Sequence, residues 1–354
     1  MRRSVLNSRR RVSYVSQQLY AQVLNTARST TFRHMRSERK ASSLKIFFAT
    51  DFHGSEMVFR KFLNSLKFYQ ADVLIFGGDI TGKVIVPIVK REGTYYSVLY
   101  GRDVKVQTEA QLNEFIKVNK NKGYYPKVVS KDEYDELESS KARRDQLFQE
   151  LMKERLEEWA KLARERLQGA KHRLYWEPGN DDAYAIDEVM DAEACVSIGD
   201  RMAELDDYRV LGLSHANMTP WKAPRDVSEE RLAEIIAKGM DGLAENDKVI
   251  MVYHPPPKDT TIDLAPRVKE DMSYASVGGQ QDMIHVGSSA VREAIASVQP
   301  IVSLHGHVHE SKGADHIGNT LCINPGSEYT EGVLRGALLV IQDRTVRNYI
   351  LVSG

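Results

Sequence analysis

Residues that can bind metal ions or move protons follow the apolar runs of this sequence, each just beyond the point where a run ends. They are Asp51, His53, Asp79, Asn180, His254, His307 and His309. Apolar runs of this length are typical of buried parallel strands, whose carboxyl ends open on a common crevice. Carboxylates, a carboxamide and imidazoles without sulfur have the composition of a metal site. The set is too large for one zinc ion, and it suits two divalent ions about 3.5–4 Å apart that share a carboxylate.

The spacing within the set supports this interpretation. One residue separates Asp51 from His53, and one separates His307 from His309, so the side chains of each pair can lie on the same side of an extended turn. Glycine is also frequent beside the set, where the backbone must turn tightly. These glycines are Gly78, Gly179 and Gly306.

The elements that must position these residues alternate between strands and helices, which indicates an α/β fold with stacked sheets. Strands are predicted at 44–50, 73–76, 172–176, 208–214, 248–253, 300–304, 320–323 and 336–342. Helical spacing of apolar residues predicts helices at 55–69, 228–239 and 288–298.

Residues 83–170 interrupt this alternation. The segment 83–107 has the turn signals of a β-meander, and a capping box at Ser130–Glu133 opens one or two long helices that continue to about residue 168. We interpret 83–170 as an inserted α+β subdomain, which could serve as a lid or as a homodimer contact through its helices. Tyrosines among its basic residues could instead stack on a nucleic acid, although tyrosines in strands commonly serve packing. These are Tyr95, Tyr96, Tyr100, Tyr124 and Tyr125.

Residues 1–43 are rich in arginine and serine and contain a single acidic residue, Glu38. We expect a solvated, flexible arm; a transit peptide or a nucleic-acid-binding arm has a similar composition. Met35 is a plausible alternative start.

Composition restricts the remaining possibilities. The chain has 354 residues, a formal net charge of zero and two cysteines, Cys195 and Cys322. The cysteine count does not support a disulfide scaffold and suits a cytoplasmic protein. The apolar runs are much shorter than the roughly 20 residues of a membrane span, so no membrane partner is expected. Zero net charge means that any nucleic-acid partner would need a local basic patch.

Five short motifs occur in a fixed order: DFH at 51–53, GGD at 77–79, GND at 179–181, YHPP at 253–256 and GHVH at 306–309. This order resembles the calcineurin-like metallophosphoesterases, whose pattern is DxH, GD, GNH(D/E), H and GHxH. The resemblance covers residues 44–345 apart from the insert at 83–170. It implies an α/β fold of four layers, the αββα metallophosphoesterase sandwich.

The resemblance also implies roles for individual residues. Three of them, Asp51, His53 and His309, would bind one metal ion. A second ion would be bound by Asn180, His254 and His307, and Asp79 would bridge the two. Asn180 and His254 would also contact the substrate, and a hydroxide between the ions would attack the phosphorus. The ions would be Mn²⁺, Fe or Zn²⁺.

The sequence departs from the family pattern at Asp181. Family members have a histidine there, which assists the leaving group, followed by an acidic residue that orients it; here Asp181 is followed by Asp182. A carboxylate of ordinary pKa, about 4, is ionised at neutral pH and cannot replace an imidazole unless burial raises that pKa. The enzyme could cleave esters whose leaving groups need no proton, His215 could supply the proton, or Asp181 could itself be the acid. We therefore retain Asp181, Asp182 and His215 as candidate catalytic residues.

The leading hypothesis is a hydrolase that acts on phosphodiesters, with nucleotide-like or other small substrates. A metal-dependent nuclease that holds its substrate with the basic arm and the insert is an alternative, as is a phosphomonoesterase or protein phosphatase. An interaction protein built on the same fold is a further alternative, which the complete ligand set argues against.

Overall fold

The computed structural model of the chain describes residues 43–167 and 174–354. The basic arm predicted at 1–43 therefore lies outside the described residues, apart from Ser43, which begins the first strand. Two residues of the strand predicted at 172–176 are also outside them.

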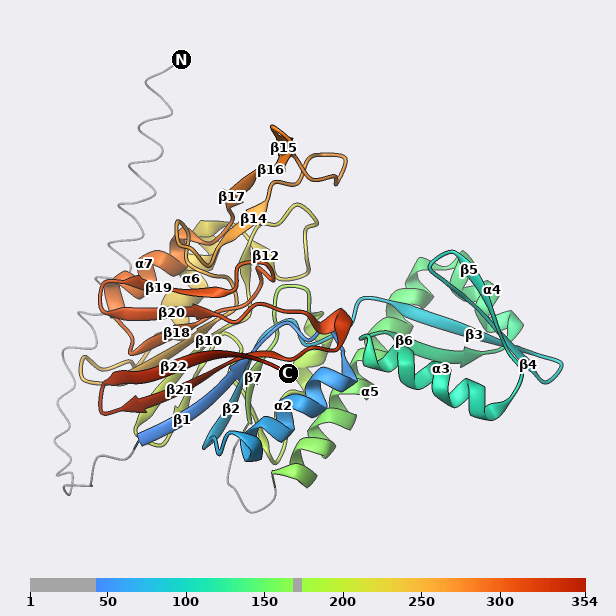
Figure 1. Cartoon of the computed structure of the whole chain (residues 1–354), viewed down its shortest axis with the longest axis horizontal. Coiled ribbons are helices and arrows are strands. Elements are labelled where there is room, and N and C mark those ends of the chain that lie inside the picture. Colours follow the sequence, from blue (N-terminus) through green and yellow to red (C-terminus); the bar gives the residue numbers. More distant parts are fainter. Residues whose placement is uncertain (1–42, 168–173) are drawn as a thin grey trace.

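In the described part of the chain, two sheets of six strands each stack face to face (Figure 1). The first has the order β22-β21-β1-β2-β7-β8, and β1, β2, β7 and β8 are parallel. Its strands are β1 (Ser43–Ala49), β2 (Val73–Gly77), β7 (Leu174–Glu177), β8 (Cys195–Ser197), β21 (Arg335–Gln342) and β22 (Thr345–Ser353).

The second sheet has the order β19-β20-β18-β13-β10-β9, with β10, β13, β18 and β20 parallel and an antiparallel strand at each edge. Its strands are β9 (Met202–Leu205), β10 (Tyr208–Leu213), β13 (Lys248–Tyr253), β18 (Val302–Leu304), β19 (Gly313–Ile317) and β20 (Thr320–Asn324).

Alternation of side chains along each strand divides the interior into three apolar layers. In β1, Phe48 packs between the two sheets, whereas its neighbour Phe47 packs against the helices outside the first sheet. In β13, Val252 faces the first sheet and Met251 faces the helices outside the second. Successive strand residues point to opposite faces, so the continuous apolar runs bury both faces of each sheet.

Helices cover the outer face of each sheet. On the first sheet lie α2 (Glu56–Phe68) and α5 (Lys141–Arg166), and on the second lie α6 (Glu229–Gly239) and α7 (Ser289–Val298). A serine caps the N-terminus of each helix, because its hydroxyl accepts a hydrogen bond from a backbone N–H of the first turn. The four layers confirm the predicted αββα sandwich.

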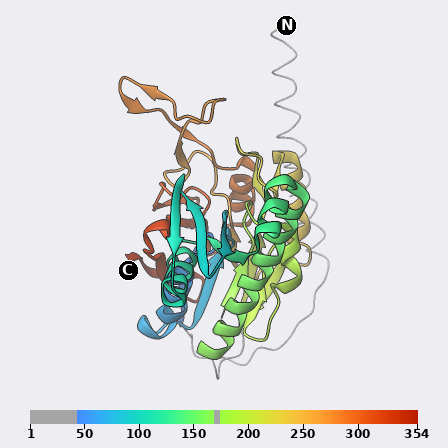
Figure 2. The ribbon, with the colours of Figure 1, turned by 90° about the vertical axis from the view of Figure 1, so that its right-hand side faces the viewer.

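Between β2 and β7 the chain leaves the sandwich and builds a separate sheet of order β5-β4-β3-β6 (Figures 1 and 2). Its elements are β3 (Ile85–Arg91), β4 (Thr94–Leu99), β5 (Arg102–Val106), α3 (Glu109–Asn121), β6 (Tyr125–Val129) and α4 (Lys131–Ser139). The capping box predicted at Ser130 and Glu133 is present at the start of α4. The helical segment divides at Ser140, and α5 then runs back to the first sheet.

Helix α5 joins the inserted sheet to the loop that follows β1. Trp159 stacks on Phe59 of α2, with 4.0 Å between ring centroids and 2° between ring planes. Arg155 is buried and donates hydrogen bonds to the carbonyls of Gly54 and Tyr124. Gly54 lies directly after His53, so α5 helps to position one of the predicted ligands.

Smaller elements complete the chain. They are η1 (Tyr184–Val189), β11 (Ala216–Asn217), β12 (Asp226–Val227), β14 (Leu264–Pro266), β15 (Ser276–Val277), β16 (Gln280–Gln281), β17 (Met283–His285) and η2 (Tyr329–Glu331). The arm from β14 to β17 extends beyond the sandwich (Figures 1 and 2). None of the helices in the described ranges is both long and apolar enough to cross a membrane.

The stack of Trp159 on Phe59 gives a prediction for stability. Because Trp159 is fully buried, Trp159→Ala should lower the free energy of unfolding by about 3–5 kcal/mol. Urea denaturation followed by circular dichroism measures this change. The matched control is Phe68→Ala, since Phe68 is an exposed aromatic residue of α2 and its loss should cost less than about 0.5 kcal/mol. Equal costs for the two variants would contradict the assignment of α5 to the core.

Candidate metal centre

All the predicted metal ligands lie at one end of the two sheets, in loops that follow the carboxyl ends of parallel strands. The first sheet supplies residues after β1, β2 and β7, and the second supplies residues after β13 and β18. Both sheets present these ends at the same edge of the sandwich, so residues up to 258 positions apart in sequence meet there.

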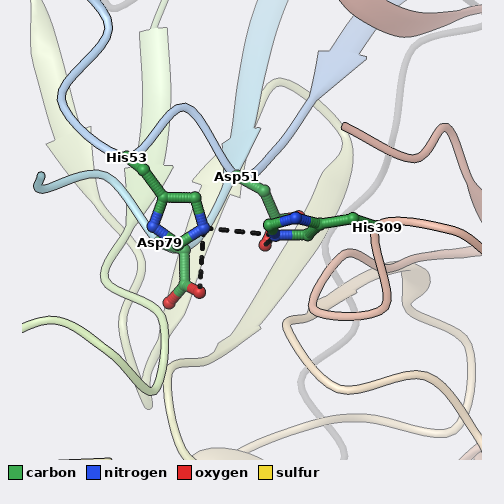
Figure 3. Close-up of side chains that lie close together, drawn as sticks. All are labelled: Asp51, His53, Asp79 and His309. Atoms are coloured by element: carbon green, nitrogen blue, oxygen red, sulfur yellow. Dashed lines mark hydrogen bonds and ion pairs between the residues drawn. The ribbon is translucent and has the colours of Figure 1, made fainter. Parts of the chain in front are cut away.

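Four of the residues form a compact cluster that could hold a metal ion. One ligand atom from each of Asp51, His53, Asp79 and His309 lies within 4.8 Å of the others (Figure 3). His53 Nε2 lies 3.2 Å from His309 Nε2 and 3.6 Å from Asp79 Oδ2, and His309 Nε2 lies 3.2 Å from Asp51 Oδ1. Two imidazole nitrogens and two carboxylates that face one another fit a shared cation.

The remaining three predicted ligands gather on the other side of Asp79. His254 Nε2 lies 3.4 Å from Asp79 Oδ1 and 3.2 Å from Asn180 Oδ1. His307 Nδ1 lies 2.9 Å from the same Asn180 oxygen. The two carboxylate oxygens of Asp79 therefore face two different groups of ligand atoms.

Neighbouring groups orient these ligands. His254 Nδ1 lies 2.8 Å from the carbonyl of Gly77, so it donates there and leaves Nε2 to face Asp79 and Asn180. The Asn180 amide donates to Asp226 Oδ1 at 2.9 Å, which turns its oxygen toward the histidines. Asp226 did not emerge from the sequence analysis, because no motif or spacing marks it.

The backbone is strained at four of the ligands. Asp51, His53, Asp79 and His307 have φ of 57°, 43°, 53° and 67°, respectively. Residues with side chains rarely adopt this left-handed region, although Asp, Asn and His do so more readily than most. Such strain persists where the surrounding structure enforces it, and it clusters at functional sites. Gly78 has φ of 102°, and a Cβ there would overlap the His254 ring.

Burial and mutual charge set the protonation of the cluster. Burial lowers the pKa of His53 to about 3 and that of His307 to about 4, so both are neutral and can offer a lone pair. Burial opposes the charge of His254, but the Asp79 carboxylate raises its pKa to about 10. Burial also opposes ionisation of Asp51, yet His309 and His254 lower its pKa to about 2. The carboxylates are thus held ionised, as metal ligands must be.

Asp182, a candidate catalytic residue, is fully buried and engaged by the protein itself. Its carboxylate accepts hydrogen bonds from the backbone N–H groups of Ile80, Thr81 and Gly179 at 2.7–2.9 Å, and from the Thr81 hydroxyl at 2.5 Å. It therefore joins the loop after β2 to the loop after β7. Its fully buried carboxylate supports the loops that carry Asp79 and Asn180, and a catalytic role for Asp182 stays a prediction.

Asp181 lies at the site and forms an ion pair with Lys83. Its backbone N–H donates to Asp79 Oδ1 at 3.1 Å. Burial and the charge of Asp79 raise the pKa of the Asp181 carboxyl to about 6, although Lys83 opposes the rise. Lys83 was not identified from the sequence, because it is one lysine among many at the start of the insert.

His215 contacts Asp200 and Tyr184 rather than the predicted metal ligands. Its Nδ1 lies 2.9 Å from Asp200 Oδ2 and its Nε2 lies 3.0 Å from the Tyr184 hydroxyl. Both ring nitrogens thus face groups outside the predicted ligand set. By contrast, Tyr329, which the sequence did not single out, lies 4.7 Å from the His53 ring, centroid to centroid.

Several of the tyrosines considered for nucleic-acid stacking make contacts within the insert. Tyr95 and Tyr125 are buried. Arg91 and Lys105 lie over the ring of Tyr96, and the hydroxyls of Tyr100 and Tyr124 are 2.6 Å apart. Tyr95 and Tyr125 therefore serve packing within the insert, whereas Tyr96 and Tyr100 are exposed.

The Asp182 network gives a second prediction. Asp182→Asn places an NH₂ group against backbone N–H donors, so it should lower the free energy of unfolding by about 1–3 kcal/mol. Urea denaturation of the metal-free chain measures it. Asp181→Asn is the neighbouring control: it removes an ion pair with the half-exposed side chain of Lys83, and pairs near the surface are worth about 0–1 kcal/mol. A negligible effect of Asp182→Asn would show that the network does not stabilise the loops.

The chain was compared with protein families, with known sequences and with solved structures. No protein-family model matches the chain. Uncharacterized protein MJ1162 of Methanocaldococcus jannaschii is 29% identical over 151 residues, which span 42% of this chain and 61% of that protein. One solved crystal structure has a TM-score of 0.50 at 19% identity and matches 85% of this chain and 99% of its own. YfcE, a phosphoesterase from E. coli, has a TM-score of 0.31 at 14% identity, with 87% and 98% covered.

The four layers, and the ordered DFH, GGD, GND, YHPP and GHVH motifs at one edge of both sheets, agree with what the motif resemblance implied. The described part of the chain therefore has the four-layer αββα fold that the motif resemblance implied.

Proposed function

We propose that this chain is a phosphoesterase that uses two divalent metal ions and prefers phosphodiesters. The observation that carries the proposal is the two-sided position of Asp79. One of its oxygens faces His53 and the other faces His254, at 3.6 Å and 3.4 Å. A carboxylate placed between two groups of nitrogen and oxygen ligands suits a bridging ligand of two ions.

The contacts of the site support the ligand assignment that the motif resemblance implied. The first ion would be held by Asp51, His53 and His309, and the second by Asn180, His254 and His307, with Asp79 shared. Imidazole and oxygen donors without thiolate suit Mn²⁺, Fe or Zn²⁺. When bound, two such ions stabilise negative charge on a phosphoryl group and make water more acidic.

The preference for diesters rests on charge around Asp181. A phosphomonoester at neutral pH carries about two negative charges and a diester carries one, so a carboxylate beside the centre repels the monoester more strongly. Position 181 also lacks the imidazole that family members have at the matching position. Lys83 partly offsets the charge of Asp181, since the two side chains form an ion pair. Diesters with good leaving groups are therefore the substrates that the site favours.

The bridging role of Asp79 is tested by metal content and activity together. Asp79→Asn removes one charged oxygen and should lower bound Mn²⁺ or Zn²⁺ from two ions per chain to one or fewer. Hydrolysis of bis-p-nitrophenyl phosphate should fall by about 10²-fold or more, as metal ligands contribute strongly to charge stabilisation. Metal analysis of the dialysed protein and a p-nitrophenol assay measure both. Asp207→Asn changes an exposed aspartate and should retain both properties; two bound ions in Asp79→Asn would refute a bridge.

The role of Asp181 is tested by restoring the family residue. Asp181→His removes a negative charge and adds a proton donor, so kcat/KM for phenyl phosphate, whose phenolate leaving group benefits from a proton, should rise about tenfold or more relative to bis-p-nitrophenyl phosphate. Asp181→Asn is the matched control, because it removes the charge and adds no imidazole. A gain shared by both variants would assign the diester preference to charge alone. Monoester hydrolysis that is already faster than diester hydrolysis in the unchanged protein would overturn the preference.

A further inference from the structure

A pocket of about 360 Å³ opens beside the candidate metal centre. His307 and Val308 of the GHVH segment form part of its wall, so the pocket and the centre share a ligand residue. Its other walls come from the segment 217–221, from the β14–β17 arm and from Lys258 and Glu229. The volume is in the range of small-molecule pockets, which are typically 300–1,000 Å³.

Large side chains in this pocket are exposed to an unusual degree. Trp221 is 53% exposed and Tyr274 is 57% exposed, and Met218 and Met283 nearby are also exposed. Trp221 and Met218 lie in the loop after β11, whereas Tyr274 lies on the arm between β14 and β17. A group of exposed apolar side chains from separate segments around a hollow is typical of a binding surface.

The charged groups of the pocket add little net charge. The Glu229 carboxylate is occupied at the start of α7, where it accepts hydrogen bonds from Ser288 Oγ, Ser289 N and Ala290 N at 2.8–3.1 Å. His285 is paired with the buried Asp263 at 2.7 Å. Lys258 and Glu310, of opposite sign, are exposed at the lining. A second phosphate would therefore gain little here, whereas an uncharged planar group could contact the aromatic rings.

We propose that this pocket binds a planar aromatic group of the phosphodiester, such as a nucleobase or an aryl ring, against Trp221 and Tyr274. The inference rests on the proposed function, because it takes the phosphate of the same molecule to lie at the metal centre beside His307. Aromatic side chains stack on any planar π-system, so the shared chemistry is the ring rather than a particular base.

The chain carries its own reporter for this binding. Of its three tryptophans, Trp159 and Trp176 are fully buried and Trp221 is exposed. A ring that stacks in the pocket should therefore quench the fluorescence of Trp221. Adenosine 3′,5′-cyclic monophosphate and diphenyl phosphate are diesters that test a nucleobase and an aryl ring, and dimethyl phosphate is a diester without either.

Titration of the full-length chain, with and without added Zn²⁺, should give saturable quenching with at least one ring-bearing ligand and none with dimethyl phosphate. Quenching by the nucleotide alone would assign a nucleobase, and quenching by both would assign any planar ring. Tyr274→Ala should raise the apparent Kd about tenfold, because the ring loses one stacking partner. Trp221→Phe should abolish the signal, while Tyr100→Ala, an exposed tyrosine of the insert, should leave the Kd unchanged.

Equal quenching by dimethyl phosphate, or an unchanged Kd in Tyr274→Ala, would overturn the proposal. Its failure is distinguishable from failure of the proposed function, since the first is measured by fluorescence and the second by hydrolysis and metal content. Metal-dependent hydrolysis without ring-dependent binding removes only the pocket assignment. Ring-dependent binding in a chain without hydrolysis removes only the phosphoesterase assignment.

Discussion

The carboxylate of Asp79 is the point on which the site depends, because the ligands of both sheets meet around it. The first sheet contributes Asp79 with its neighbours Asp51, His53 and Asn180, and the second contributes the three remaining histidines. Neither sheet alone supplies a complete set of ligands for either group. The apolar layer between the sheets therefore has a chemical consequence, since its packing determines how closely the two sets of loops approach.

Several buried hydrogen bonds hold this arrangement against the backbone strain at four ligands. Asp182 joins the loops after β2 and β7, and Arg155 of α5 donates to the carbonyl of Gly54. Ser55 donates to the carbonyl of Asn121 at the end of α3. The last two contacts come from the insert, so the insert supports the metal-binding loop besides projecting from the sandwich. Strained backbone of this kind costs roughly 1–3 kcal/mol per residue, and it persists only where such contacts enforce it.

Much of the fold was predictable because continuous apolar runs of strand length are typical of strands that are buried on both faces. The strand predicted at 248–253 has the bounds of β13, and the helices predicted at 228–239 and 288–298 differ from α6 and α7 by one residue at the start. The strand β22 was not predicted, because it is a largely exposed edge strand whose polar and apolar residues do not alternate regularly. The pairing of β3 with β6 was also missed, since it joins segments separated by α3.

The sequence by itself determined which residues could bind metal, because residue type and position after a strand can be read locally. It also indicated stacked sheets, through the order of apolar runs and helices, and its motifs implied the αββα layers through their resemblance to a known family. Only the tertiary structure decided that Asp182 is a structural acceptor, that Asp226 orients Asn180 and that Lys83 pairs with Asp181. It alone brought Trp221 and Tyr274 to one pocket. These relations join residues about 45 to 100 positions apart, and such contacts depend on how the layers pack, which local pattern does not specify.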